Sequence, residues 1–207
     1  MPSTYSPSIL VILGSVRDGR RTDKVSAWVS AYLSTRQDMT FTQADVKTID
    51  LPMYAYPASP EDGDVAYTDQ KEDAWRAQVN AADGFLMLTP EYNHGYPPGL
   101  KNMIDYLYAQ WNNKPVAFVS YGGISGGIRA VEQLRQVAVE MQLVPISSGV
   151  HIQYVGKAFT DDGKPTNEQL NLRLAKTIDQ LVWWANVLHY ARTHTEEFKG
   201  IHPTQHA

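Results

Sequence analysis

Short apolar runs alternate with segments of helical periodicity along this 207-residue chain, and this alternation constrains the fold more than any other feature. The runs cover residues 8–14, 84–90, 115–122 and 143–152, and a weaker run covers 40–49. Continuous apolar runs of this length indicate strands that are buried on both faces. The sequence therefore predicts five strands in the interior of the protein.

Helical spacing of apolar residues fills the intervals between these strands. It predicts helices over 22–35, 69–82, 98–109 and 125–142, and a long last helix from Leu170 to Leu188. Strands that alternate with helices form a parallel sheet, with the connecting helices on its two faces. We therefore expect an α/β protein with an open five-stranded parallel sheet. The proline-rich stretch 51–68 is predicted to be a long loop, and no linker or repeat indicates a second domain.

The composition excludes several classes of protein. Hydrophobic residues make up 43% and charged residues 19%, the balance of a globular chain. The net charge of −4 argues against a nucleic-acid partner, and no apolar run approaches the roughly 20 residues of a membrane helix. With no cysteine, disulfides, thiolate catalysis and cysteine metal sites are excluded. The histidines lack paired ligand spacing, so no metal site is predicted. Because the first residues do not resemble a signal peptide, we expect a cytoplasmic location.

The loop over 14–22 has the composition of a phosphate site. Ligands of open parallel sheets lie outside the carboxyl ends of the strands. Here Ser15, Arg17, Arg20 and Thr22 supply donors directly before a predicted helix, whose amino end also favours anions. The nucleotide-binding P-loop pattern fails, since basic residues follow its second glycine, and no dinucleotide fingerprint follows a strand. The alternative is a solvated basic turn.

Two further loops, over 89–97 and 120–127, predict a site for a flat ligand with polar edges. Pro90 and two later prolines restrict the backbone of the first, which carries Tyr92 and Asn93. The second loop is rich in glycine, which permits close backbone approach. The alternative is that the tyrosines pack in the core and Asn93 forms a turn. A mononucleotide with a large ring satisfies all three loops, and FMN is the candidate.

The motifs of these loops resemble those of a known family. They are GSVRDGR at 14–20, PEYN at 90–93 with GLKNMID at 99–105, and YGGISGGIRAVEQLR at 121–135. The chain resembles the NADPH-dependent FMN reductases of the flavodoxin-like superfamily, a group that includes azo, quinone and chromate reductases. This resemblance implies one flavodoxin-like FMN-binding domain over 1–207, with a core over 8–190 and a C-terminal tail over 191–207.

The resemblance also implies roles for individual residues. The phosphate of FMN would be held by Ser15, Arg17, Arg20 and Thr22. The isoalloxazine would be lined by Pro90, Glu91, Tyr92 and Asn93, with Tyr121, Gly122, Gly123 and Ser125 across from them. The family further implies homodimers or homotetramers with flavins near a subunit interface. The cluster of Tyr106, Tyr108 and Trp111 lies either at such an interface or in the core.

The resemblance implies an oxidoreductase that transfers a hydride from NADPH through bound FMN to a small acceptor. The acceptor classes are quinones, azo compounds, free flavin and metal oxyanions. Because two loops cover one side of the ring, both substrates would use the open face in turn, which predicts ping-pong kinetics. No side chain is nominated as a catalytic acid or nucleophile. The alternatives are a flavodoxin-like electron carrier, disfavoured by the basic residues near the phosphate, and a regulatory protein that senses FMN or NAD(P)H.

Overall fold

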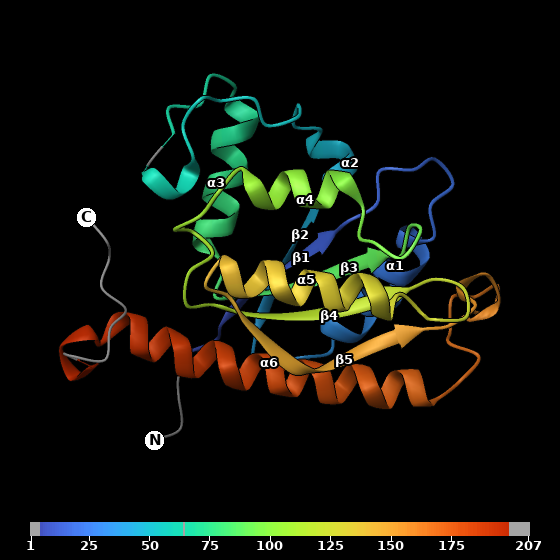
Figure 1. The fold of residues 1–207 in the computed structure, drawn as a ribbon. Helices are drawn as coiled ribbons and strands as arrows, with labels where there is room; N and C mark the ends of the chain where they lie inside the picture. Colours follow the sequence, from blue (N-terminus) through green and yellow to red (C-terminus); the bar gives the residue numbers. More distant parts are fainter. Residues whose placement is uncertain (1–4, 64, 199–207) are drawn as a thin grey trace.

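The five strands form one parallel sheet in the order β2-β1-β3-β4-β5 (Figure 1). The computed structural model describes residues 5–63 and 65–198. The strands are β1 (Ser8–Leu13), β2 (Thr40–Asp45), β3 (Gly84–Pro90), β4 (Pro115–Tyr121) and β5 (Val144–Ile152). This is the strand order of the flavodoxin-like fold, in which the direction of winding reverses between β1 and β3. The predicted fold class is confirmed.

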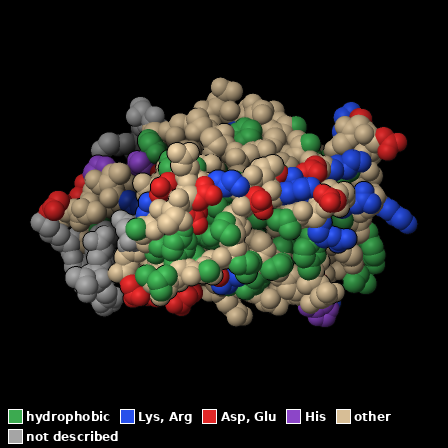
Figure 2. All heavy atoms as spheres, turned by 90° about the horizontal axis from the view of Figure 1, so that it is seen from above, with side chains coloured by type: hydrophobic (Ala, Val, Ile, Leu, Met, Phe, Trp, Pro, Cys, Tyr) green, Lys and Arg blue, Asp and Glu red, His purple; other side chains and the backbone are tan. Residues whose placement is uncertain are grey.

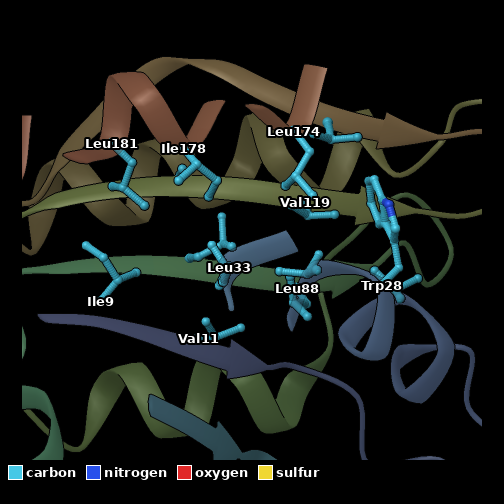
Figure 3. Packing of buried hydrophobic residues seen from close by; sticks show 14 of the residues in the cluster. Ile9, Val11, Trp28, Leu33, Leu88, Val119, Leu174, Ile178 and Leu181 are labelled. Carbon is cyan, nitrogen blue, oxygen red and sulfur yellow. The ribbon is translucent and has the colours of Figure 1, made fainter. Parts of the chain in front are cut away.

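Helices cover both faces of this sheet. One hydrophobic cluster joins β1, β3 and β4 to α1 (Thr22–Leu33) and α6 (Gln169–Thr193). Figure 3 shows this cluster, with Leu174, Ile178 and Leu181 of α6 facing Val119 of β4. A second cluster packs α3 (Gln70–Ala81), α4 (Pro98–Asp105) and α5 (Ile128–Glu140) on the opposite face. Successive residues of β1 belong to the two clusters alternately, as the pleat of a doubly covered strand requires.

The second strand is shorter than the sequence predicts, because β2 ends at Asp45 and residues Val46–Ile49 form the short helix α2. The Asp45 carboxylate caps this helix by accepting a hydrogen bond of 2.9 Å from the backbone N–H of Lys47. Asp50 then ends the helix in the left-handed region, at φ 51°. A polar cap between two apolar residues therefore converts the expected end of the strand into a helical turn.

The helix expected over 98–109 also ends early, at Asp105. Two indole N–H groups use carbonyls of its last turn, since Trp75 donates to Met103 O (2.9 Å) and Trp111 donates to Ile104 O (3.1 Å). Trp111 is fully buried, so its position in the core bends the chain after Asp105. Three of the four other helix predictions are correct to within three residues at each end, for example α5 at Ile128–Glu140 against 125–142. The last helix, expected from Leu170 to Leu188, continues to Thr193.

Over its described residues, 51–63 and 65–68, the predicted loop is irregular apart from one 3-10 turn, η1 (Pro60–Asp62). Asn102 of α4 holds its start, because the amide accepts from Tyr54 N (2.9 Å) and donates to Pro52 O (2.7 Å). Of the predicted tail 191–207, the first residues continue α6 and Thr195–Phe198 form the 3-10 turn η3, while 199–207 lie outside the described residues. No helix within 5–63 or 65–198 combines the length and hydropathy needed to cross a membrane.

Candidate active site

The register of the sheet brings the ends of all five strands to one edge. Leu13 at the end of β1 pairs with Leu88 on one side and with Asp45 on the other. Pro90 of β3 pairs with Tyr121 of β4, which in turn pairs with Ile152 of β5. The loops that leave β1, β3 and β4 therefore start side by side, and they lie together at the right of Figure 1.

The first loop leaves β1 in close contact with β3. Gly14 donates its N–H to Leu88 O (2.9 Å), and a Cβ on Gly14 would lie 3.0 Å from that same oxygen. Ser15, which is buried, places its Oγ 2.6 Å from the Tyr92 hydroxyl, so the first and second loops are joined. The guanidinium of Arg17 lies 5.6 Å from the centre of the Tyr92 ring, and its side chain is exposed.

The side chain of Arg20 stabilises this loop through hydrogen bonds. Its guanidinium makes two hydrogen bonds to the Asp45 carboxylate, at 2.6 and 2.5 Å, and donates to Ser15 O (2.6 Å) and to Asp23 (2.8 Å). The Arg20 side chain is only 9% exposed. Burial alone would raise the pKa of the Asp45 carboxyl, but the hydrogen bonds from Arg20 and from Lys47 N–H hold it below its usual range. The donors of Arg20 are therefore used to fix the loop.

Thr22, the first residue of α1, faces the sheet instead of the surface. Its hydroxyl and that of Tyr121, both buried, form a hydrogen bond. Burial raises the pKa of Tyr121, so its hydroxyl stays protonated. This contact fixes the start of α1 against the last residue of β4, directly beneath the glycine-rich loop.

The second loop reverses in a tight turn. Tyr92 and Gly95 exchange two backbone hydrogen bonds, each 2.9 Å long, around Asn93 (φ 49°) and His94 (φ 72°). Two successive residues with positive φ define a type I′ turn, where asparagine is preferred. Asn93 and His94 are both exposed at its tip. The alternative considered for Asn93, a turn former, therefore describes its local structure.

Glu91 joins the second loop to the third. Its carboxylate, 8% exposed, accepts hydrogen bonds from Ser125 Oγ (2.9 Å), Arg129 N (3.2 Å) and Arg129 Nη1 (2.9 Å). Burial raises the pKa of this carboxyl, but the donors on Arg129 and Ser125 outweigh burial and lower it. A charged Glu91 therefore anchors the start of α5 and the loop that precedes it.

The third loop requires glycine at two successive positions. Gly126 and Gly127 have φ 63° and 86°, and a Cβ on Gly127 would lie 2.7 Å from Ser120 Cβ. Ser120 Oγ donates to Gly126 O (2.8 Å) and lies 2.7 Å from His151 Nδ1. By contrast, the space around a Cβ on Gly123 is open within 4 Å. The loop is thus packed against β4 and β5 on one side and open at Gly123.

These loops enclose a groove of about 330 Å³. Eight of the twelve predicted site residues line it: Ser15, Arg17, Arg20, Pro90, Glu91, Tyr92, Tyr121 and Gly122. Of the other four, Gly123 lines a neighbouring groove, whereas Thr22, Asn93 and Ser125 lie outside the lining of both. The structure therefore gathers most of the predicted residues and assigns Thr22 and Ser125 to the support of the loops.

The predicted site residues did not include four that line the groove, which are Asp18, Gly19, Arg21 and Val155. They also did not include two supporting residues, Asp45, which pairs with Arg20, and Arg129, which pairs with Glu91. Val155 and Asp45 follow or end β5 and β2, whose carboxyl ends lie at the same edge as those of the other strands. The predicted topology carried this signal, because every strand of a parallel sheet ends at one edge.

Comparison with known proteins gives one family. Residues 7–156 match the model of the family described as NADPH-dependent FMN reductase. An NAD(P)H-dependent FMN reductase of Schizosaccharomyces pombe is 40% identical over 142 residues, which cover 68% of this chain and 70% of that protein. A quinone reductase of Escherichia coli is 32% identical over 136 residues, covering 63% of this chain and 69% of that protein.

Solved structures show the same fold. The flavoenzyme FerB of Paracoccus denitrificans, an NAD(P)H:(acceptor) oxidoreductase, superposes with a TM-score of 0.69 at 25% identity. The alignment covers 87% of this chain and 97% of that protein.

Proposed function

The chain belongs to the family of NADPH-dependent FMN reductases, and on this basis we propose that it reduces a small acceptor with NADPH through FMN held in the groove at the carboxyl edge of the sheet. Members of the family are NAD(P)H-dependent flavin oxidoreductases. Quinones, azo compounds, free flavin and metal oxyanions are the acceptor classes we propose. A single FMN-binding domain would contain the whole site.

The observation that carries this proposal is the chemistry of the two ends of the groove. At one end the exposed guanidinium of Arg17 and the amino end of α1 offer positive charge to a phosphate. At the other end lie Tyr92, Tyr121 and Gly122, and the glycine backbone admits the close approach of a flat ring. The residues present therefore fit FMN, with its phosphate at the first end and its ring at the second.

The residues around the groove would have different roles in binding FMN. Arg17 would bind the phosphate directly, while Arg20 would hold the loop in shape through Asp45. Glu91 would keep the second and third loops at a fixed separation through Ser125 and Arg129. Such rigid placement of donors avoids reorganisation when the ligand binds.

FMN bound here would accept a hydride from the reduced nicotinamide and deliver two electrons to the acceptor. The chain's part is to hold the ring against the second and third loops so that one face stays open. The nicotinamide must approach the ring within about 3–3.5 Å. An acceptor must use the same face, so the two substrates would exclude each other and the kinetics would be ping-pong.

Anaerobic titration tests the function. Purified protein loaded with FMN should lose its visible absorbance when NADPH is added and regain it when a quinone follows. Steady-state NADPH oxidation with that quinone separates a reductase from a flavodoxin-like electron carrier, which would not turn over small molecules. Parallel double-reciprocal plots at several quinone concentrations would support the ping-pong order, whereas intersecting lines would contradict it. Protein that takes up no FMN would refute the proposal as a whole.

We also propose a homodimer or homotetramer and a cytoplasmic location. Of the residues considered for an interface, Tyr106 and Trp111 are fully buried in the core, so they are excluded as direct contacts. Tyr108 is half-buried and lines a groove with Tyr54 and Met141. Hydrophobic side chains gather on the surface in the lower half of Figure 2. Sedimentation equilibrium would give the oligomeric state, and cell fractionation the location.

A further inference from the structure

A second groove, of about 620 Å³, adjoins the flavin groove. It is lined by Gly122, Gly123 and residues 154–157, and it shares Gly122 and Val155 with the first groove. The flavin groove already has a place for the phosphate and for the ring of FMN. The second groove is therefore available to a ligand that must lie beside the flavin.

One wall of this second groove is η2 (Val155–Lys157), which is fixed to the glycine loop. Tyr154 N donates to Gly123 O (2.9 Å), and Val155 N donates to Gly122 O (3.0 Å). These bonds hold Tyr154 at φ 45°, an unfavourable conformation for a bulky side chain, with 57% of the residue exposed. A strained, exposed aromatic residue at the rim of a groove is poised to stack on a flat ligand.

Two cationic side chains flank the same turn. Lys157 lies on η2 and is exposed. Arg21 lines the neighbouring flavin groove, and its Nη2 lies 3.9 Å from the position that a Cβ would take on Gly156. Within the described part of the chain, neither Lys157 nor Arg21 forms an ion pair with a carboxylate. Figure 2 shows Lys and Arg side chains gathering at this end of the molecule, at the right of the view.

We infer that this second groove binds the adenosine end of the dinucleotide, with Tyr154 stacked on the adenine and Lys157, assisted by Arg21, paired with the 2′-phosphate. The inference rests on the proposed function, since the nicotinamide must lie on the flavin and the rest of the molecule must then continue into an adjoining space. A 2′-phosphate is a dianion near neutral pH, and its loss would leave two cations without a partner. The pair therefore selects NADPH over NADH.

Binding without turnover tests this inference. Calorimetric titration of the FMN-loaded protein compares 2′-phospho-ADP-ribose with ADP-ribose, which differ only in the 2′-phosphate. Lys157→Met should raise the dissociation constant of 2′-phospho-ADP-ribose about tenfold, the effect of one charge-assisted hydrogen bond, and leave that of ADP-ribose unchanged. Lys157→Arg should restore most of the affinity. Lys164→Met is the matched control, because Lys164 is 81% exposed and pairs with Asp162.

Tyr154 requires a separate pair of variants. Tyr154→Asn removes the aromatic ring and introduces a residue that tolerates the left-handed conformation. Both 2′-phospho-ADP-ribose and ADP-ribose should then bind about five- to a hundredfold more weakly. Tyr154→Phe should retain the affinity. If Lys157→Met weakened the binding of 2′-phospho-ADP-ribose and of ADP-ribose equally, or weakened neither, the assignment of the 2′-phosphate to Lys157 would be overturned.

The affinity for FMN distinguishes the flavin from the dinucleotide as the occupant of this groove. It should be unchanged in Lys157→Met, and a large loss would assign the groove to the flavin and overturn the inference. Failure of the proposed function has a different signature, because the wild-type protein would then not be reduced by NADPH or by NADH. The two proposals therefore fail separately.

Discussion

Replacing Glu91 with glutamine removes one negative charge from the joint between two loops of the site. The carboxylate accepts three hydrogen bonds, from Ser125 Oγ, Arg129 N and Arg129 Nη1. Glutamine keeps one acceptor oxygen, so the variant Glu91→Gln loses the charge and at least one of these bonds. The change is nearly isosteric and leaves no cavity. The change in unfolding free energy therefore measures the electrostatic contribution of Glu91 to the contact between the second and third loops.

The magnitude follows from the exposure of the two partners. The Arg129 side chain is 45% exposed, so solvent screens the ion pair, and we assign it about 0.5–1 kcal/mol. The weakened bonds from Ser125 and Arg129 N–H contribute about 0.5–1 kcal/mol more. The expected loss of unfolding free energy is then about 1–2 kcal/mol. For a chain of this length it corresponds to a Tm lower by about 2–8 °C.

The loss of stability should depend on pH with a definite sign. The folded protein holds the pKa of Glu91 below its unfolded value, so the carboxylate stabilises the fold above the unfolded pKa of about 4.3. That stabilisation disappears as the pH falls through the folded pKa. Urea unfolding of wild type and variant should differ at pH 7 and converge in acid. The control is Glu132→Gln, which changes an exposed glutamate on α5, the helix that also carries Arg129.

The same variant separates anchoring from chemistry. If Glu91 only positions the loops, reduction of bound FMN by NADPH should slow by less than about tenfold in Glu91→Gln, equivalent to 1.4 kcal/mol of barrier. Stopped-flow absorbance measures this rate. A thousandfold slower reduction in a stable variant would refute the anchoring role, and so would an unchanged urea midpoint at pH 7. A double-mutant cycle with Arg129→Met would isolate the pair.

Three further changes test other parts of the site. Arg17→Ala should raise the dissociation constant of FMN about 10- to 150-fold in a folded protein, measured by flavin fluorescence; no change would place the phosphate elsewhere. Gly127→Ala should destabilise by about 2–5 kcal/mol in thermal unfolding, through its positive φ and its contact with Ser120, whereas Gly123→Ala should be near neutral. Asp45→Asn should lower the free energy of unfolding by about 1–3 kcal/mol at pH 7. Its urea unfolding curve should approach that of wild type in acid, because the pKa of Asp45 is lowered in the folded protein and the charged carboxylate no longer stabilises the fold once the pH falls below that pKa.

The elements that could be predicted from the sequence are those whose pattern is local. The buried strands β1, β3 and β4 are continuous apolar runs, and their ends coincide with the predicted ends to within one residue. The loops after them were predicted because glycine, proline and polar aromatic residues interrupt those runs. A parallel sheet then placed the loops together.

The features that could not be predicted depend on partners distant in the chain. Arg20 has the composition of a phosphate ligand, but Asp45, 25 residues later, engages its guanidinium in the folded protein. From the sequence, Trp111 could lie at a subunit interface or in the core, and in the folded protein it is fully buried, with its indole N–H donating to Ile104 O of α4. For both residues the local sequence allows two roles, and a tertiary contact determines which role the residue has.

The residues that line the groove are spread along the chain from Ser15 to Val155, which affects how the protein is made. During synthesis the ribosome releases β1 long before β4 or the segment after β5 exists, so a nascent chain has no complete place for FMN. The cofactor therefore cannot template early folding. Once bound, it stabilises the assembled sheet as a unit, by about 2.7 kcal/mol at a concentration 100 times the dissociation constant. Flavin supply in the cell would thus govern the lifetime of the finished protein and not the rate at which it first folds.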